Sequence, residues 1–414
     1  MMPIFKERGI KLWLLVAVLL PSLIKLKFET SSMAAGLVAA ELLMLLAALV
    51  FISFKPRFFL LRPALFSISF ILCLISLHYF ISGMFVSLPQ DGLRFIGTLI
   101  AFALLIIAAA ILASSLVLCN QGAVRRIISC VMIVLVVNGI LSLTGIDYLG
   151  TGTQKAAFLF SEPSHFALIT APFLIYSVRS RCRGWAFFLL VFFCYAAFLE
   201  NLTMLIVAFL ATIVGIRAGK LLLLIPALIV LFVLFVDTNY FFDRLVFSID
   251  EANVSGLVFL QGWQNAYLAF LDTDGWGVGF QQFGIASPTG DVTERIRALN
   301  GNLDLNLFDG GSTASKLLGE FGLFGAIIDM MFIVRAVQAL WILKRVEYLP
   351  DLTLFAKCVE IGILIELFIR GVGYFSPGIF IYCVMYFVQR GNRNSKISAA
   401  VTGMKHGHHV HLIK

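Results

Sequence analysis

A glutamate and a histidine stand three residues apart inside an otherwise apolar stretch. Residues 157–173 read AFLFSEPSHFALITAPF, with Glu162, Pro163 and His165 at the start of a predicted membrane helix. A carboxylate there costs free energy, about 2.5–3.5 kcal/mol at the membrane centre and less near the edge, so it is usually paired, hydrated or functional. Proline suits the first helical turn, and Ser161 is the expected N-cap. Because residues three apart share a helix face, the spacing predicts an acid–base pair.

The alternative for both residues is structural. Glu162 could satisfy the amides of the first helical turn, and His165 could be packed at the membrane interface. A carboxylate or an imidazole can also take a proton from a reacting hydroxyl, which is the functional reading. Either residue could then be the base, with the other as its partner.

The composition predicts an all-α polytopic membrane protein. Hydrophobic residues make up 60% of the chain and charged residues 13%, against about 45–50% and about 25% in soluble domains. The apolar runs are continuous, without the alternation of a membrane barrel. Seven cysteines without CxxC spacing predict neither disulfides nor a metal site.

The apolar runs predict about twelve membrane spans. Basic residues fall in alternate short loops, which places both termini in the cytoplasm by the positive-inside rule. The formal charge of +8 therefore reports topology and not nucleic-acid binding. Lys25 and Lys27 are exceptions, because they lie on the opposite side. The predicted spans are residues 10–26, 33–54, 63–85, 94–117, 125–145, 164–178, 184–200, 202–216, 220–236, 312–342, 353–369 and 374–388.

The spans divide the chain into four parts. Residues 1–236 hold nine spans, 237–311 form one large periplasmic loop, 312–390 hold three spans, and 391–414 form a cytoplasmic tail. The loop carries ten carboxylates and three arginines, a formal charge of −7. Within it, helical spacing of apolar residues predicts a helix over 256–271 that lies on the membrane. Four histidines in the tail could bind a metal ion, but we leave them out of the mechanism.

Four stretches together resemble the Wzy-type bacterial polysaccharide polymerases, which are related to the O-antigen ligases. LFSEPSHFA at 159–167 is similar to the family's F-x-E-P-S signature, and GWGVGFQQF at 275–283 to a G-x-G-x-x-x-F element late in the periplasmic loop. STASKLLGEFGLFG at 312–325 is similar to a helix start that ends in Glu-x-Gly-x-x-Gly. LFIRGVGYFSPGIF at 367–380 is similar to an arginine-bearing penultimate helix.

The resemblance implies a glycosyltransferase C-like membrane enzyme of the bacterial inner membrane. Such an enzyme transfers a glycan from undecaprenyl pyrophosphate to the sugar of a second lipid-linked repeat unit, at the periplasmic face and without metal or cofactor. Glu162 is the expected base and His165 its partner. Arginine forks suit phosphate oxygens, so the pyrophosphate is expected at Arg94, Arg370 and Arg244. The expected substrate contacts of the loop stretches are Gly277, Gly279 and Lys316.

One departure favours a polymerase over a ligase. Many ligases and some polymerases carry a His-Asn pair before the third stretch, where this chain has Asp309 and two glycines. An O-antigen ligase, which transfers polymer to a lipid A core, remains the alternative. A flippase is a third hypothesis, but the two halves show no repeat and the outer loop is long. A length-regulating partner protein stays open.

Overall fold

The computed structural model describes residues 6–30, 32–52, 61–146, 148, 157–216 and 254–391. Over these residues the chain is helical, apart from one isolated bridge between Ala157 and Phe160. The predicted span 220–236, Arg244 and the histidines of the tail lie outside the described residues.

The first eight helices follow the predicted spans closely, which confirms a helical membrane protein at this level. Asp91, Asn120 and Asn201 cap three of them by accepting a hydrogen bond from a first-turn amide. The eight helices are α1 (Glu7–Phe28), α2 (Ala34–Ile52), α3 (Leu61–Ser82), α4 (Gly92–Val117), α5 (Gln121–Leu143), α6 (Pro163–Ser180), α7 (Trp185–Phe198) and α8 (Leu202–Gly215).

Six further helical stretches follow in the second half. They are α11 (Val254–Asp272), α12 (Asp291–Leu299), α13 (Thr313–Phe321), α14 (Leu323–Arg345), α15 (Asp351–Phe368) and residues 377–391. Helix α11 confirms the helix predicted over 256–271. Among the described helices, five are long and apolar enough to cross a membrane: α1, the 65–82 part of α3, α4, α5 and α14.

The predicted single span 312–342 is wrong, because the chain breaks at Gly322. This glycine has φ +55°, and a Cβ on it would lie 1.9 Å from the carbonyl oxygen of Gly275. Only glycine fits that backbone and that contact. Helix α13 therefore has 9 residues, about 13 Å, which is too short to cross a bilayer. After the break at Gly322 the chain continues as α14.

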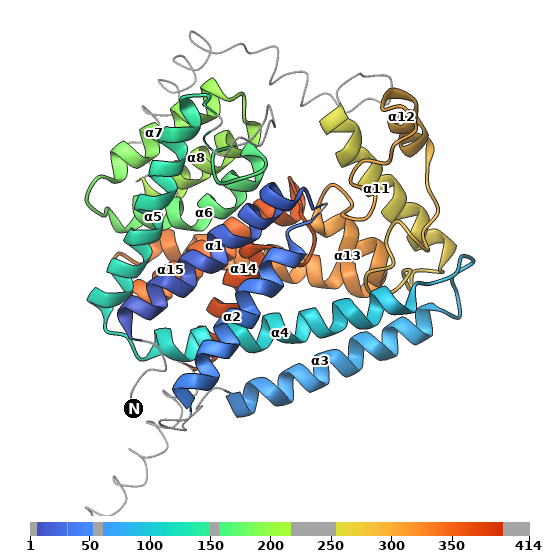
Figure 1. Cartoon of the computed structure of the whole chain (residues 1–414), viewed down its shortest axis with the longest axis horizontal. Helices are drawn as coiled ribbons and strands as arrows, with labels where there is room; N and C mark the ends of the chain where they lie inside the picture. Colours follow the sequence, from blue (N-terminus) through green and yellow to red (C-terminus); the bar gives the residue numbers. More distant parts are fainter. Residues whose placement is uncertain are drawn as a thin grey trace, which may run out of the picture.

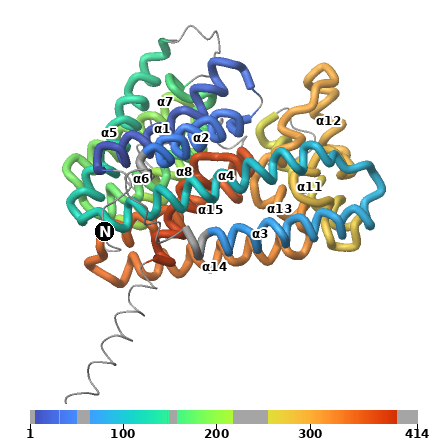
Figure 2. Tube along the Cα trace, turned by 60° about the horizontal axis from the view of Figure 1, so that its bottom comes forward, coloured from blue at the N-terminus to red at the C-terminus, as the bar shows by residue number. Residues whose placement is uncertain are grey.

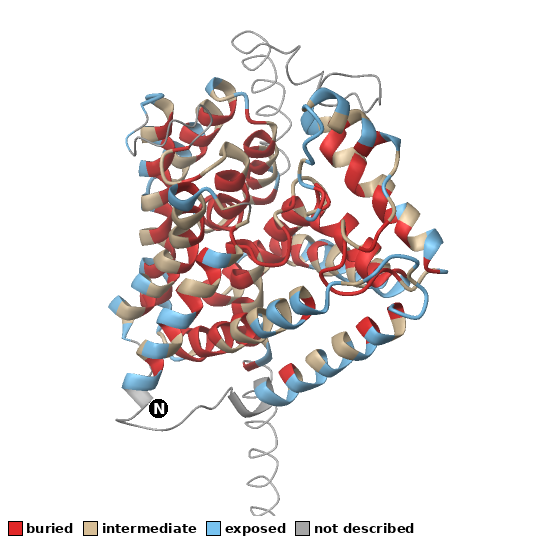
Figure 3. Ribbon diagram, turned by 45° about the vertical axis from the view of Figure 1, so that its right-hand side comes forward, coloured by how far each residue is buried: buried red, intermediate tan, exposed pale blue. Residues whose placement is uncertain are grey.

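Helix α6 is the centre of the bundle. Every residue from His165 to Val178 is buried, and α6 packs chiefly on α8 and α15. In Figure 1 the bundle around α6 lies on the left and α11–α13 on the right. Helices α3 and α4 extend along the lower part of the view from one side to the other. Figure 3 shows buried residues concentrated inside the bundle and in the adjoining loops, with exposed residues on the outer helix faces.

Helices α3 and α4 form a long hairpin whose tip reaches the α11 region (Figure 2). Two reciprocal bonds fix the tip: Gln282 Oε1 accepts from the Asp91 amide at 2.7 Å, and Gln282 Nε2 donates to the Asp91 carbonyl at 3.1 Å. Ser87 donates to Asp272 at the end of α11. The outer face of α3 is apolar and exposed, with Phe66 76% accessible, as expected for contact with lipid.

Candidate functional site

The turn before α6 is held from two neighbouring helices. The Asn138 side chain of α5 donates to the Ala157 carbonyl at 3.2 Å and accepts from the Leu159 amide at 3.1 Å. Ser22 of α1 accepts from the Ser161 amide at 3.3 Å. Both Asn138 and Ser22 are buried, so the start of α6 is fixed against α1 and α5.

Glu162, and not Ser161, is the N-cap residue of α6. Its backbone is extended, with φ −144° and ψ 143°, and Pro163 takes the first helical position. The Glu162 side chain makes no capping hydrogen bond. The Ser161 hydroxyl lies 3.3 Å from His165 Nδ1 instead of reaching a first-turn amide. The carboxylate of Glu162 is thus free to turn towards other elements.

That carboxylate is surrounded by three nitrogen groups from three parts of the chain. Arg370 Nη2 donates to Glu162 Oε2 at 3.0 Å. His165 Nε2 lies 3.7 Å from the same oxygen, and Lys25 Nζ lies 3.9 Å from Oε1. The predicted proximity of Glu162 and His165 on one helix face is confirmed. We call Lys25, Glu162, His165 and Arg370 the cation cluster.

Three of the four side chains in the cation cluster are shielded from solvent, while the Glu162 side chain is 36% accessible. The side chains of Lys25 and Arg370 are 17% and 20% accessible, and that of His165 is 3% accessible. Burial would raise the pKa of Glu162, but the neighbouring positive charges, those of Arg370 and Lys25 among them, outweigh it and lower the pKa to about 2. Glu162 is therefore an anion held by cations.

Arg370 keeps donor capacity beyond its bond to Glu162. It follows α15, and its amide donates to the Ile365 carbonyl at 3.0 Å, which closes the helix. Its Nε is buried and has no hydrogen-bond partner among the described residues. A buried donor without a partner costs about 1–3 kcal/mol. Such a group is suited to an anion that is bound during function.

The loop before α13 contacts two arginines or their neighbours that the sequence predicted as pyrophosphate ligands. The Gly371 amide, next to Arg370, donates to the Gly311 carbonyl at 3.0 Å. Arg94 at the start of α4 has its guanidinium carbon 4.8 Å from the centre of the Phe308 ring. The loop therefore contacts both Arg94 and the segment of Arg370. The Arg94 guanidinium lies over Phe308, and among the described residues it forms no ion pair with Glu162.

Lys316 is a buried residue of α13. Its ammonium donates to the Phe308 carbonyl at 2.7 Å and lies 3.9 Å from Asp309 Oδ1. Glu320 Oε1 lies 3.8 Å from it, at the four-residue spacing that brings two side chains together on one helix face. The Lys316 side chain is 2% accessible. These contacts give Lys316 the structural task of fixing the loop; its direct contact with substrate stays a prediction.

The glycine-rich stretch packs against the end of α13. The Val278 and Gly279 amides donate to the carbonyls of Gly319 and Glu320 at 2.9 Å and 2.8 Å, which satisfies carbonyls that a helix end leaves free. A Cβ on Gly277 would lie 2.6 Å from the Glu320 carbonyl oxygen. These glycines therefore have a structural explanation, and their role in substrate binding stays a prediction.

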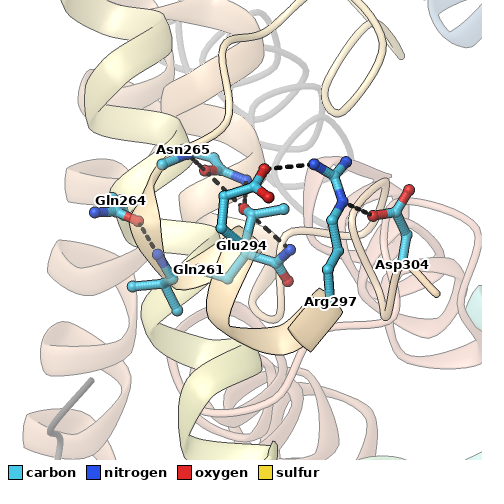
Figure 4. A network of polar contacts seen from close by, with 9 residues as sticks. Gln261, Gln264, Asn265, Glu294, Arg297 and Asp304 are labelled. Atoms are coloured by element: carbon cyan, nitrogen blue, oxygen red, sulfur yellow. Dashed lines mark hydrogen bonds and ion pairs between the residues drawn. The ribbon is translucent and has the colours of Figure 1, made fainter. Parts of the chain in front are cut away.

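A polar network holds α12 on α11 (Figure 4). Gln261 and Asn265 both donate to Thr293 Oγ1 at 3.2 Å, and Gln264 accepts from the Val292 amide. Arg297 bonds Glu294 and Asp304 on the outside of the same unit. Because these polar groups satisfy one another, the network is a scaffold for the loop and leaves Arg297 engaged away from the cation cluster.

Sequence reasoning missed Lys25 as a member of the site. Its signal was that it opposed the positive-inside pattern at the outer end of the first span. A lysine that departs from the positive-inside pattern is expected to have a local partner. In the structure that partner is Glu162. Among the described residues, no group of His, Cys, Asp and Glu could hold a metal ion.

No family model, no curated protein and no solved structure matches this chain.

Proposed function

We propose that this protein transfers a glycan from a polyprenyl pyrophosphate to a sugar hydroxyl of a second lipid-linked repeat unit, as a polysaccharide polymerase. The observation that carries the proposal is the cation cluster, in which Arg370 has a buried donor without a partner. The four stretches similar to Wzy-type polymerases add support, because two of them supply Glu162 and Arg370.

The leaving group of such a transfer is a lipid pyrophosphate, which needs cations in a shielded place. Arg370 offers a planar guanidinium that can donate two parallel hydrogen bonds to phosphate oxygens. Lys25 offers a compact ammonium on the other side of Glu162. No metal is needed where two such groups neutralise the charge that develops on the leaving oxygen.

In this proposal the main role of Glu162 is to position Arg370 and Lys25, and not to act as the base. A carboxylate with its pKa at about 2 is a weak proton acceptor at neutral pH. Its first task is to keep Arg370 and Lys25 aimed at one point.

The proposal includes the topology that the sequence predicts. About twelve spans, both termini in the cytoplasm and a periplasmic loop over 237–311 would put the cluster at the periplasmic face of the inner membrane. The start of α6, the end of α15 and the outer end of α1 meet at one place, as this topology requires.

The experiment is to measure polymer length in cells that carry Arg370→Ala at matched expression. We expect polymer to fall at least about 100-fold, with single repeats accumulating, because one lost charge-stabilising group costs that much in rate. Arg126→Ala is the control, since Arg126 pairs with Glu7 at the opposite end of α1. Normal polymer from Arg370→Ala would reject the site. A block only in attachment of finished polymer to lipid A core would indicate a ligase.

A further inference from the structure

The loop just before α13 presents an exposed aromatic ring beside an uncommitted carboxylate. Phe308 and Asp309 are consecutive, and the loop that bears them contacts the segment of Arg370. We infer that Phe308 and Asp309 form the acceptor subsite, in which the ring stacks on a sugar face and the carboxylate receives the proton of the attacking hydroxyl. The inference rests on the proposed function and adds its second substrate position.

The Phe308 ring is supported from behind and open in front. It is 44% accessible, and the Arg94 guanidinium covers one face at 4.8 Å. Its edge is close to Gly284, where a Cβ would lie 3.0 Å from Phe308 Cδ1. A cation on one face stabilises the ring in place. The C–H groups of a pyranose face can then pack on the exposed ring.

Asp309 has the freedom that Glu162 lacks. Among the described residues, its carboxylate accepts no hydrogen bond, and its one ion-pair partner is Lys316 at 3.9 Å. The Asp309 side chain is 28% accessible, so a hydroxyl can reach it. A base needs to come within hydrogen-bond distance of the proton that it takes, and an accessible carboxylate that accepts no hydrogen bond can do so.

The backbone places Asp309 next to the cation cluster. Asp309 Oδ1 lies 3.1 Å from where a Cβ on Gly373 would be, three residues after Arg370. Asp309 also attracts the Lys25 ammonium electrostatically. The charges of two carboxylates, Glu162 and Asp309, therefore act on Lys25. The donor's pyrophosphate on Arg370 and Lys25 would sit beside an acceptor held at Asp309 and Phe308.

The step balances without another reactant. The acceptor oxygen forms a bond to the anomeric carbon of the donor sugar, while the bond from that carbon to the phosphate oxygen breaks. The electron pair of the broken bond leaves on the pyrophosphate, where Arg370 and Lys25 bind the charge. The hydroxyl proton passes to Asp309, which later releases it to water.

Two measurements on the purified full-length protein in lipid nanodiscs test the subsite. The first is chain extension against the concentration of lipid-linked repeat extracted from cells that lack this protein. The second is binding of undecaprenyl pyrophosphate, which occupies the donor position only. The variants are Phe308→Ala, Phe308→Trp and Asp309→Asn. The controls from the same loop are Leu303→Ala, an exposed apolar residue, and Asp304→Asn, which pairs with Arg297.

We expect Phe308→Ala to raise the half-saturating concentration of repeat about tenfold, as loss of a central aromatic contact does, and Phe308→Trp to restore it. We expect Asp309→Asn to lower the maximal rate about 100-fold, the contribution of a general base. Both should bind undecaprenyl pyrophosphate within about twofold of wild type.

Three results would overturn the inference. In the first, Phe308→Ala and Asp309→Asn behave like their controls while the wild type binds undecaprenyl pyrophosphate and extends chains; the proposed function then stands without this subsite. In the second, Phe308→Ala or Asp309→Asn weakens undecaprenyl pyrophosphate binding about tenfold or more, which would place the loop at the donor. In the third, the wild type neither binds nor extends, and the proposed function fails as well.

Discussion

At the scale of single residues, the organising feature is a carboxylate that two cationic side chains and a buried imidazole share. Glu162 accepts from Arg370 and lies close to both His165 and Lys25. Because the cluster holds one anion and more than one cation, it keeps a net positive charge that can bind a second anion. This is the property that a pyrophosphate site needs. The same pairing makes Glu162 less suited to proton transfer than Asp309.

A pH experiment tests the ion pairing of Glu162. The pKa of Glu162 is about 2, below its ordinary 4.5, so the carboxylate stabilises the fold above pH 4.5 and loses this contribution as the pH falls towards 2. We expect Glu162→Gln to be less stable than wild type at pH 7 by about 1–2 kcal/mol, since partial exposure screens the pair.

The measurement is thermal unfolding of wild type and Glu162→Gln between pH 7 and pH 3. The difference between the two proteins should shrink as the pH falls below about 4.5, because the unfolded wild type then takes up a proton at Glu162 while the folded protein keeps it ionised. A difference that stays constant across this range would mean that Glu162 is not ion-paired in the folded protein.

Some residues of the site could be predicted from sequence and others could not. Glu162, His165 and Arg370 stood out because a charge in an apolar segment needs a reason. Lys25 did not, since its partner is 137 positions away in the chain. Asp309 was noted only as a departure from a motif. The groups that act on Asp309, which are Lys316, Gly373 and the Lys25 ammonium, come from three other elements, and local patterns do not encode such contacts.

At the scale of elements, the break between α13 and α14 decides how the loop before α13 meets the bundle. The Leu323 amide donates to the Gly275 carbonyl at 2.9 Å, directly after the break at Gly322. This contact fixes the angle between the two helices. The apolar sequence of 312–342 predicts one continuous helix because its pattern does not change at Gly322.

Replacing Gly322 by alanine should destabilise the protein. Its Cβ would lie 1.9 Å from the Gly275 carbonyl oxygen, at φ +55°, so the backbone has to move. We expect a loss of about 3 kcal/mol or more from strain and overpacking together. Gly301→Ala is the matched control, because Gly301 has φ +62° and nothing within 4 Å of its added Cβ.

Thermal unfolding of the two alanine variants separates the steric cost of the added Cβ from the cost of a positive φ. Gly301→Ala carries only the conformational cost, about 1 kcal/mol. Equal melting temperatures for the two variants would show that the contact of Gly322 with Gly275 does not hold α13 and α14 in place.

At the scale of the whole molecule, hydrophobic patterning predicted most helices but not their assembly. The described helices from α1 to α8 begin and end within a few residues of the predicted spans, because continuous apolar runs bounded by polar residues are a strong signal. The glycine-rich stretch was read for ligand contact, and its amides instead complete the end of α13. Such a use depends on a partner that lies far away in sequence.

In the assembled molecule α1, α6 and the segment after α15 converge on Glu162, and we propose that Lys25 and Arg370 bind one pyrophosphate there. The direct measurement is titration of undecaprenyl pyrophosphate into the purified protein in lipid nanodiscs, for wild type, Arg370→Ala, Lys25→Met and the control Lys27→Met. We predict that the first two variants lose about tenfold or more in affinity, while Lys27→Met binds like wild type. Equal affinity in all four proteins would contradict the claim.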